Sequence, residues 1–199
     1  MEPMPTVTVP TLAGARVLLR ALRPDDLEVF GERERDPEIV RMLGGEAADA
    51  GRRPTPEEAR RWYESVSTST NPHEWIIDVG GRHVGSCRLF NPVEWDRRAS
   101  YAIGISEPAL LGRGLGREAS ALVLDHAFGP AGLHRVELQV LAYNTRAIAC
   151  YRACGFVEEG RQRQAARVDG AWYDFVLMAI LEDTWRTRRP QPSPAQARL

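Results

Sequence analysis

The chain has 199 residues, of which 43% are hydrophobic, so it is long enough and apolar enough for one globular domain with a sizeable core. Its formal net charge of −1 gives no reason to expect nucleic acid as a partner. No apolar run approaches the roughly 18 residues of a membrane-spanning helix, and the N-terminus lacks an apolar signal segment. The cysteines, an odd number, favour a reducing environment. We therefore expect a cytoplasmic protein that binds neither membrane nor nucleic acid.

The first half of the chain carries signals for short helices and antiparallel strands. Residues 1–11 are rich in proline and are expected to form a flexible segment. Asp36-Pro37 supplies a helix N-cap with proline at the first helical position, and residues 55–58 form a capping box. Gly80-Gly81 separates two apolar runs and predicts a hairpin. These signals predict strands over 16–20, 74–79, 84–90 and 98–105, and helices that begin near Asp25, Asp36 and Thr55.

The second half alternates strands and helices and closes with a hairpin. Asn144 is a predicted N-cap, Gly155 a predicted helix end, and Asp169-Gly170 the predicted turn of the hairpin. Residues 184–199, rich in arginine and proline, are expected to form a flexible tail. The order of elements predicts one α+β domain over residues 12–183, with a mixed, curved sheet of about seven strands flanked by helices. The expected elements here are helix 116–128, strand 135–141, a helix from Asn144 to Gly155, and strands 156–164 and 172–181.

The loop Leu111-Gly112-Arg113-Gly114-Leu115-Gly116 joins a predicted strand to a predicted helix. Such a loop presents free backbone N–H groups beside the positive end of a helix dipole, which favours an anion such as a phosphate. A Walker loop is excluded because no lysine follows the last glycine, and the glycine spacing is not that of a dinucleotide-binding fold. Taken alone, the loop is equally well explained as a tight turn.

A second motif begins about 30 residues after this loop and changes the interpretation. It matches the pattern Asn-x-x-Ala-Ile-x-x-Tyr-x-x-x-Gly-Phe through Asn144, Ala147-Ile148, Tyr151 and Gly155-Phe156 without a gap. Together with Gly114 and Gly116, this combination resembles the GNAT superfamily of acyl-CoA-dependent N-acetyltransferases, although Leu111 departs from the Gln or Arg of the family loop. Two further segments resemble the Rim-type branch, named for ribosomal-protein alanine N-acetyltransferases, namely Leu18-x-Arg20-x3-Pro24-x-Asp26-Leu27 and Asp169-Gly170-x-Trp172-x-Asp174.

The resemblance implies a site for acetyl-CoA without a metal. It implies that the amides of residues 112–116 hold the pyrophosphate, that the strand before the loop hydrogen-bonds the pantetheine arm, and that this strand splays from strand 135–141 to admit the thioester. Arg113 and Arg117 either add charge or are solvated surface arginines. Asn144 is expected to cap its helix and to contact the cofactor. The predicted cofactor-binding residues are Ile103, Gly104, Ile105, Leu111, Gly112, Arg113, Gly114, Leu115, Gly116, Arg117, Asn144, Ala147 and Tyr151.

Tyr151 is the predicted catalytic residue. Amine attack on a thioester expels a thiolate, which a nearby phenol can protonate; the alternative is a helix tyrosine that only packs. The general base is not assigned, because the strand before the glycine loop carries no acidic residue where many relatives have Glu. The remaining candidates are Glu74, Asp78, Glu94, Glu137 and Asp174.

The resemblance does not identify the acceptor. A protein N-terminal α-amine and a small-molecule amine both remain open, with direct transfer in a ternary complex in either case. A homodimer is compatible with this interpretation. The alternative from another class is a CoA-binding regulatory or interaction module with weak or lost catalysis.

Overall fold

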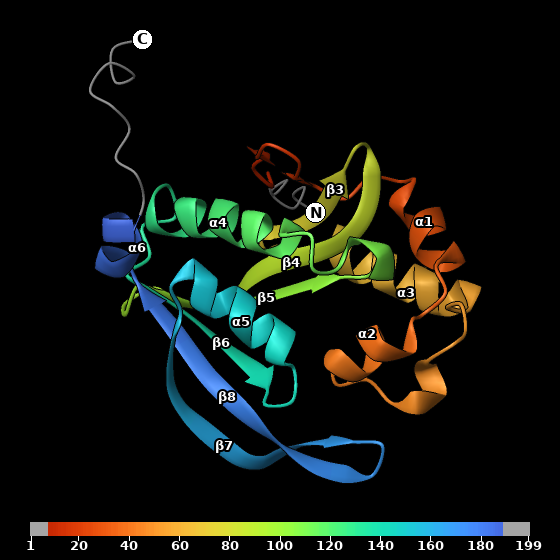
Figure 1. The fold of residues 1–199 in the computed structure, drawn as a ribbon. Helices are drawn as coiled ribbons and strands as arrows, with labels where there is room; N and C mark the ends of the chain where they lie inside the picture. Colours follow the sequence, from red (N-terminus) through yellow and green to blue (C-terminus); the bar gives the residue numbers. More distant parts are fainter. Residues whose placement is uncertain (1–7, 189–199) are drawn as a thin grey trace.

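A computed structural model of the chain describes residues 8–188. One eight-stranded sheet forms the centre of the molecule, in the order β1-β2-β3-β4-β5-β6-β8-β7. Helices α4 and α5 lie side by side across one face of the sheet, whereas α1, α2 and α3 cluster beside the end of β5 (Figure 1). The strands are β1 Leu12–Ala13, β2 Leu18–Arg20, β3 Glu74–Val79, β4 Arg82–Val93, β5 Arg98–Ile105, β6 Arg135–Leu141, β7 Val157–Val168 and β8 Ala171–Leu181. The helices are α1 Asp26–Glu32, α2 Pro37–Met42, α3 Pro56–Ser67, α4 Leu115–Phe128, α5 Thr145–Cys154 and α6 Glu182–Arg188.

Side-chain caps form the predicted starts of α2, α3 and α5, whereas α1 begins after Asp25 without one. The Asp36 carboxylate accepts from the N–H of Ile39 at 3.0 Å. Thr55 and Glu58 form the reciprocal capping box, at 3.2 and 2.8 Å. Asn144 accepts from the N–H of Ala147 at 3.1 Å. Each of these bonds satisfies a donor that has no partner within its helix, which is why these polar residues fix where α2, α3 and α5 begin.

The predicted α+β fold with a mixed sheet is confirmed, with small differences in its strands. The sheet has one strand more than expected, because Leu12 and Ala13 pair with Leu19 and Leu18 as the short strand β1. Residues 1–7 and 189–199, which belong to the predicted flexible ends, lie outside the described residues. The start of the predicted tail is helical, as part of α6, where the Trp185 indole N–H donates to Asp125 at 3.0 Å.

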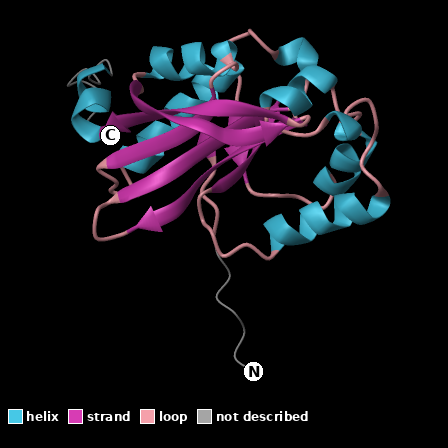
Figure 2. Cartoon of the chain, turned by 90° about the horizontal axis from the view of Figure 1, so that it is seen from below, coloured by secondary structure: helices cyan, strands magenta, loops and turns pink. Residues whose placement is uncertain are grey.

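Strands β5 and β6 separate along their length. They pair in parallel only at Arg98–Ser100 with Arg135–Glu137. Beyond these residues β5 stays paired with β4, and β6 stays paired with β8. The two strands therefore splay apart and leave a gap between the two halves of the sheet. Figure 2 shows the sheet edge-on, with helices above it and to one side. The gap leaves backbone groups of both strands without a ladder partner, as the resemblance predicted.

The core lies between the sheet and helix α4. Val123 and Leu124 of α4, Val136 of β6 and Val176 of β8 are all fully buried. Burying side chains of this size contributes about 1.5–3 kcal/mol each. This core fixes the position of α4, and therefore of the glycine loop at its N-terminus.

A second, polar cluster is buried in the N-terminal part of the sheet. Arg20 forms a bidentate pair with Asp26, at 2.8 and 2.9 Å, and its Nε donates to Asp78 at 2.8 Å. Burial acts to raise the pKa of Asp26, but hydrogen bonds from Arg20 and from the N–H of Arg23 hold that pKa below its usual value. The side chain of His83 lies 3.5 Å from Asp26. Arg20 and Asp26 of the Rim-type motif therefore form a structural ion pair.

Among the helices of residues 8–188, none has the length and apolar character needed to cross a membrane.

Candidate active site

The glycine loop presents unpaired backbone donors. The N–H groups of residues 112–116 make no hydrogen bond within the described part of the chain. Gly112 and Gly114 have φ angles of +73° and +80°, and α4 begins directly after Gly114. Only glycine adopts this left-handed conformation without strain. Several donors that converge at the N-terminus of a 14-residue helix form a cradle for an anion, so the loop fits a diphosphate.

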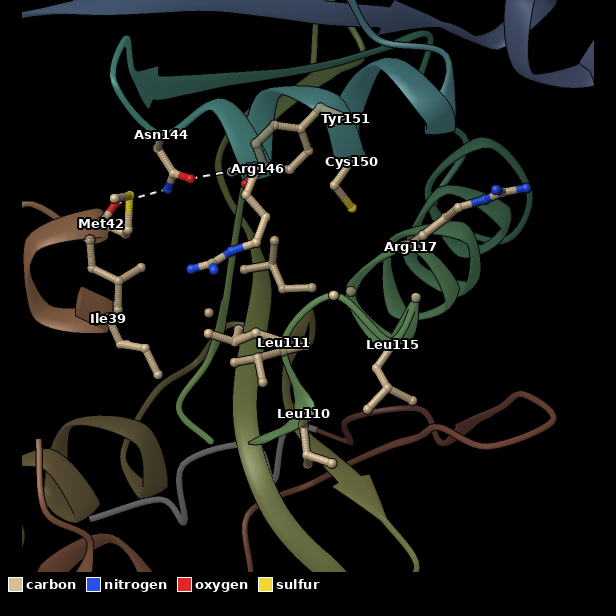
Figure 3. A pocket seen from close by; sticks show the side chains of 18 residues that line it. Ile39, Met42, Leu110, Leu111, Leu115, Arg117, Asn144, Arg146, Cys150 and Tyr151 are labelled. Carbon is tan, nitrogen blue, oxygen red and sulfur yellow. Dashed lines mark hydrogen bonds between the residues drawn. The ribbon is translucent and has the colours of Figure 1, made fainter. Parts of the chain in front are cut away.

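Two arginines near this loop have different surroundings. Arg16 donates to the carbonyl oxygen of Arg113 and to the carboxylate of Glu118, both at 2.9 Å, and so ties the loop to the N-terminal segment. The Arg113 side chain does not line the pocket described below. Arg117 does line it, although its guanidinium extends outward from the other labelled residues (Figure 3). The side chain of Arg113 therefore fits the alternative of a solvated surface arginine.

A pocket of about 330 Å³ extends from the glycine loop to the gap between β5 and β6. Every predicted cofactor-binding residue except Arg113 lines it, so the structure brings together residues from β5, α4 and α5. The sequence analysis missed the contribution of α2 and its C-terminal cap. Arg146 and Cys150 were also missed, although their spacing from Ala147 and Tyr151 on α5 was a usable signal. The additional lining residues are Ile39, Met42, Leu43, Leu110, Arg146 and Cys150.

A second hollow, of about 890 Å³, lies over strands β4 to β8. Six residues line both spaces, so the pocket and the hollow meet in the gap between β5 and β6. We call the second space the acceptor hollow. The shared residues are Met42, Leu43, Ile103, Asn144, Ala147 and Tyr151.

Tyr151 stands at this junction. Its ring packs edge-on against Tyr101 and Phe156, with centroids 6.4 and 5.7 Å apart. The residue is only 7% exposed, yet its hydroxyl makes no hydrogen bond to the described residues. Burial raises the pKa of Tyr151 well above its ordinary value, so the phenol keeps its proton at neutral pH. The hydroxyl of Tyr101, by contrast, is hydrogen-bonded to Ser120 at 3.0 Å.

Asn144 connects the site to helix α2. While its oxygen caps α5, its side-chain N–H donates to the carbonyl oxygen of Met42 at 3.0 Å (Figure 3). Next to it, the hydroxyl of Tyr143 donates to the carbonyl oxygen of Arg41 at 2.6 Å. Arg146 adds an ion pair with Glu38 at 2.9 Å. These bonds hold α2 against the start of α5 and so close one side of both spaces.

Four of the five candidate bases lie outside the lining of the acceptor hollow, namely Glu74, Asp78, Glu94 and Asp174. Asp78 is buried in the ion pair with Arg20. The carboxylate of Asp174 accepts from the N–H of Gln164 at 2.9 Å. Glu74 lies 3.8 Å from Arg88. None of these four is positioned in the hollow to take a proton from an amine.

Glu137 does line the acceptor hollow, together with Glu159, which the sequence analysis did not consider. Arg98 and Arg135 donate to Glu137 at 2.8 and 3.0 Å. Arg135 also donates to both oxygens of Glu159, at 2.8 and 2.5 Å. These hydrogen bonds lower the pKa of Glu159. Both carboxylates are therefore engaged by arginine.

Residues 8–188 contain no cluster of three or more side chains suited to a metal ion. All three cysteines are free thiols. The Sγ atom of Cys150 would lie 3.8 Å from a Cβ at Gly116, so α5 packs closely against the start of α4.

The fold is that of solved acetyltransferases. A solved structure of the spermidine N-acetyltransferase from Vibrio cholerae, in complex with CoA and spermine, superposes with a TM-score of 0.72 over 87% of this chain and 99% of the other. The two sequences are 24% identical in that superposition, which supports a shared fold.

The family described as an acetyltransferase (GNAT) domain matches residues 16–157, and the chain belongs to this family. The curated spermidine N(1)-acetyltransferase of Vibrio cholerae is 34% identical over 175 residues, covering 87% of this chain and 98% of the relative. The N-alpha-acetyltransferase RimI of Mycobacterium tuberculosis is 41% identical over 108 residues, covering 51% of this chain and 63% of RimI. The protein is a GNAT acetyltransferase that uses acetyl-CoA.

Proposed function

We propose that this protein transfers the acetyl group of acetyl-CoA directly to a primary amine within a ternary complex. The observation that carries the proposal is the junction of the pocket and the acceptor hollow at Tyr151. Two reactants that approach from these two spaces meet at one point without an intermediate carrier. Such positioning converts a reaction between two molecules into one within a complex.

The unpaired N–H groups of residues 112–116 would hold the pyrophosphate of the cofactor, with Arg117 adding charge at its side. The unpaired edge of β5 at Ile103–Ile105 would hydrogen-bond the pantetheine arm. When bound, acetyl-CoA supplies a thioester whose carbonyl carbon the amine attacks. Asn144 keeps α5 and α2 in place on either side of the gap.

Tyr151 would act as the general acid. Its hydroxyl holds a proton, because burial keeps its pKa high, and it has no competing hydrogen bond among the described residues. It can therefore give that proton to the departing sulfur, and the proton that the attacking amine loses then restores the phenol. Of the candidate bases, only Glu137 lies in the acceptor hollow. Since two arginines engage it, we assign it no role as a base.

We also propose membership of the Rim-type branch, supported by the motif at residues 18–27 and by the final hairpin. The hairpin turn Asp169-Gly170 has two positive φ angles, +48° and +79°, as a tight two-residue turn requires. The names of the relatives support both acceptor classes, since one is a spermidine enzyme and the other an N-alpha-acetyltransferase.

A cytoplasmic location and a homodimer complete the proposal. The free cysteines support the first. The outer edge of β7, which is unpaired at the end of the sheet, and the exposed Val157 beside it support the second. Light scattering after size-exclusion chromatography measures the assembly.

The deciding experiment measures thiol release from acetyl-CoA across a panel of amines and peptides, with mass spectrometry of the acetylated product. Calorimetry with CoA runs in parallel. We expect CoA binding and thiol release with at least one amine. A protein that binds CoA but releases no thiol with any acceptor would be the regulatory module instead. Absence of binding at millimolar CoA would contradict the site itself.

A further inference from the structure

Among the charged side chains that line the acceptor hollow, arginines outnumber glutamates. Three arginines and two glutamates line it. The glutamates do not offer free negative charge, because Glu137 and Glu159 are both hydrogen-bonded by Arg135, and Glu137 also by Arg98. The other two arginines of the lining, Arg88 and Arg167, take no part in these hydrogen bonds to Glu137 and Glu159.

Arg88 and Arg167 lie on opposite sides of the gap. Arg88 is on β4 and pairs in register with Ala102, the residue before Ile103 at the junction. Its side chain is 51% exposed, forms a long ion pair with Glu74 at 3.8 Å, and lies over the ring of Phe90 at 4.9 Å. Arg167 is on β7 and is exposed, and it makes no hydrogen bond or ion pair through its side chain to the described residues. An acceptor that reaches the junction therefore passes between two cations.

The nearby carboxylates outside the lining are also engaged. Asp169, next to the lining residue Val168, accepts from the N–H of Ala47 at 2.5 Å. Asp174 accepts from the N–H of Gln164. Both carboxylates keep their charge, but neither lines the hollow.

The size of the hollow indicates an extended acceptor. It crosses β4, β5, β6, β8 and β7, which at about 4.8 Å between neighbouring strands is a width of at least about 19 Å. An extended peptide, at about 3.3 Å per residue, would span this width with five or six residues.

We infer that the acceptor is the N-terminal α-amine of a peptide or protein with acidic residues next to its N-terminus, and that polyamines are disfavoured. This inference rests on the proposed function, because it places the acceptor in the hollow. A carboxylate one or two residues after the amine would lie near Arg88 or Arg167. A polyamine would bring several positive charges into a hollow with no free carboxylate, and like charges brought together cost binding energy.

The first test compares three acceptors at equal concentration: a peptide Ala-Asp-Asp followed by neutral residues, the same peptide with Lys in place of both Asp, and spermidine. We expect kcat/KM for the acidic peptide to exceed that of the other two by about tenfold or more at low salt. The preference should shrink at about 1 M salt, where the Debye length is only about 3 Å. Equal rates, or spermidine as the best acceptor, would overturn the inference but leave the proposed function intact. No product with any amine, despite CoA binding, would contradict the proposed function instead.

The second test reverses the charges. Arg88→Glu with Arg167→Glu should remove or invert the preference for the acidic peptide over the Lys peptide. Arg60→Glu, on an exposed face of α3 outside the hollow, makes the same kind of charge change and should leave the preference unaltered. A preference that persists in the double variant would show that these arginines do not select the acceptor. Acetyl-CoA binding, measured for each variant, confirms that each is folded.

Discussion

Two groups of polar atoms in this protein have opposite arrangements. In the N-terminal part of the sheet, Arg20, Asp26 and Asp78 satisfy one another at distances of 2.8–2.9 Å. At the gap between β5 and β6, the Tyr151 hydroxyl and the N–H groups of the glycine loop have no partner among the described residues. Buried polar groups that are paired avoid a desolvation cost, whereas polar groups that open onto a pocket are free to bind a ligand. The comparison therefore separates the residues that hold the fold from those that we propose serve the reaction.

The largest expected effect concerns the unpaired phenol. Tyr151→Phe keeps the ring against Tyr101 and removes only the proton donor. Because general acid catalysis is worth about 10²–10⁴-fold, kcat should fall by that factor while acetyl-CoA affinity is nearly unchanged. Steady-state kinetics with the best acceptor and calorimetry with CoA measure both quantities. The matched variant Tyr63→Phe, on α3, should behave as the parent.

Two outcomes would contradict this role. A rise in KM with unchanged kcat would mark Tyr151 as a binding contact. A large loss of kcat in Tyr101→Phe, with none in Tyr151→Phe, would assign the donor to the other phenol.

Substitution in the paired group of Arg20, Asp26 and Asp78 should lower the stability of the fold. Arg20→Met leaves two buried carboxylates without their cation, so the free energy of unfolding should fall by about 3–5 kcal/mol. Urea unfolding followed by circular dichroism measures it. Arg61→Met is the control, since the Arg61–Glu57 pair is exposed on a helix surface and worth about 0.5 kcal/mol. A loss below about 1 kcal/mol in Arg20→Met would show that the cluster is not structural.

His83 makes the stability of this region depend on pH. Burial, and the positive charge of Arg33, lower its pKa to about 4 in the folded protein, against about 6.5 when unfolded. The unfolded state therefore binds the proton more tightly, and stability rises with pH between these values. Through His83, the free energy of unfolding is about 3 kcal/mol higher above pH 6.5 than at pH 4, where the folded protein must also bind the proton.

Urea unfolding across pH 4–8 measures this dependence. Burial also lowers the pKa of His73 and His126, so they add to the slope in the same direction. The difference between the parent and His83→Gln isolates the contribution of His83. Parallel curves for the two proteins would rule out a lowered pKa at this residue.

The smallest effect is expected from a substitution in the glycine loop, whose N–H groups at residues 112–116 form the anion cradle. Gly114→Val places a β-branched side chain at a φ of +80°, which costs about 1–2 kcal/mol. The loop should shift, and CoA affinity by calorimetry should fall about tenfold while the melting temperature of the free protein changes little. Gly160→Val is the matched control, because its Cβ would meet nothing within 4 Å and its φ is ordinary. Unchanged affinity in Gly114→Val would place the phosphate site elsewhere.

Local sequence signals predicted much of this fold correctly. The caps at Asp36, Thr55 and Asn144 and the left-handed Gly155 mark helix ends, because they act on backbone groups within four residues. Strand β1 was missed because two residues carry no periodic pattern. The family resemblance identified the residues around the pocket, although their roles are still predictions.

By itself the sequence determined where helices and strands begin, that one α+β domain forms, and that the glycine loop precedes a helix, since these depend on neighbouring residues. Only the tertiary structure decided that Arg20 and Asp26 pair in the core, and that Leu43 and Met42 complete the pocket. The bond from Asn144 to Met42 joins residues 102 positions apart. The engagement of Glu137 by Arg98 likewise depends on two strands, β5 and β6, that meet in the sheet. Contacts at such separation follow from how the whole chain packs, so no local pattern contains them.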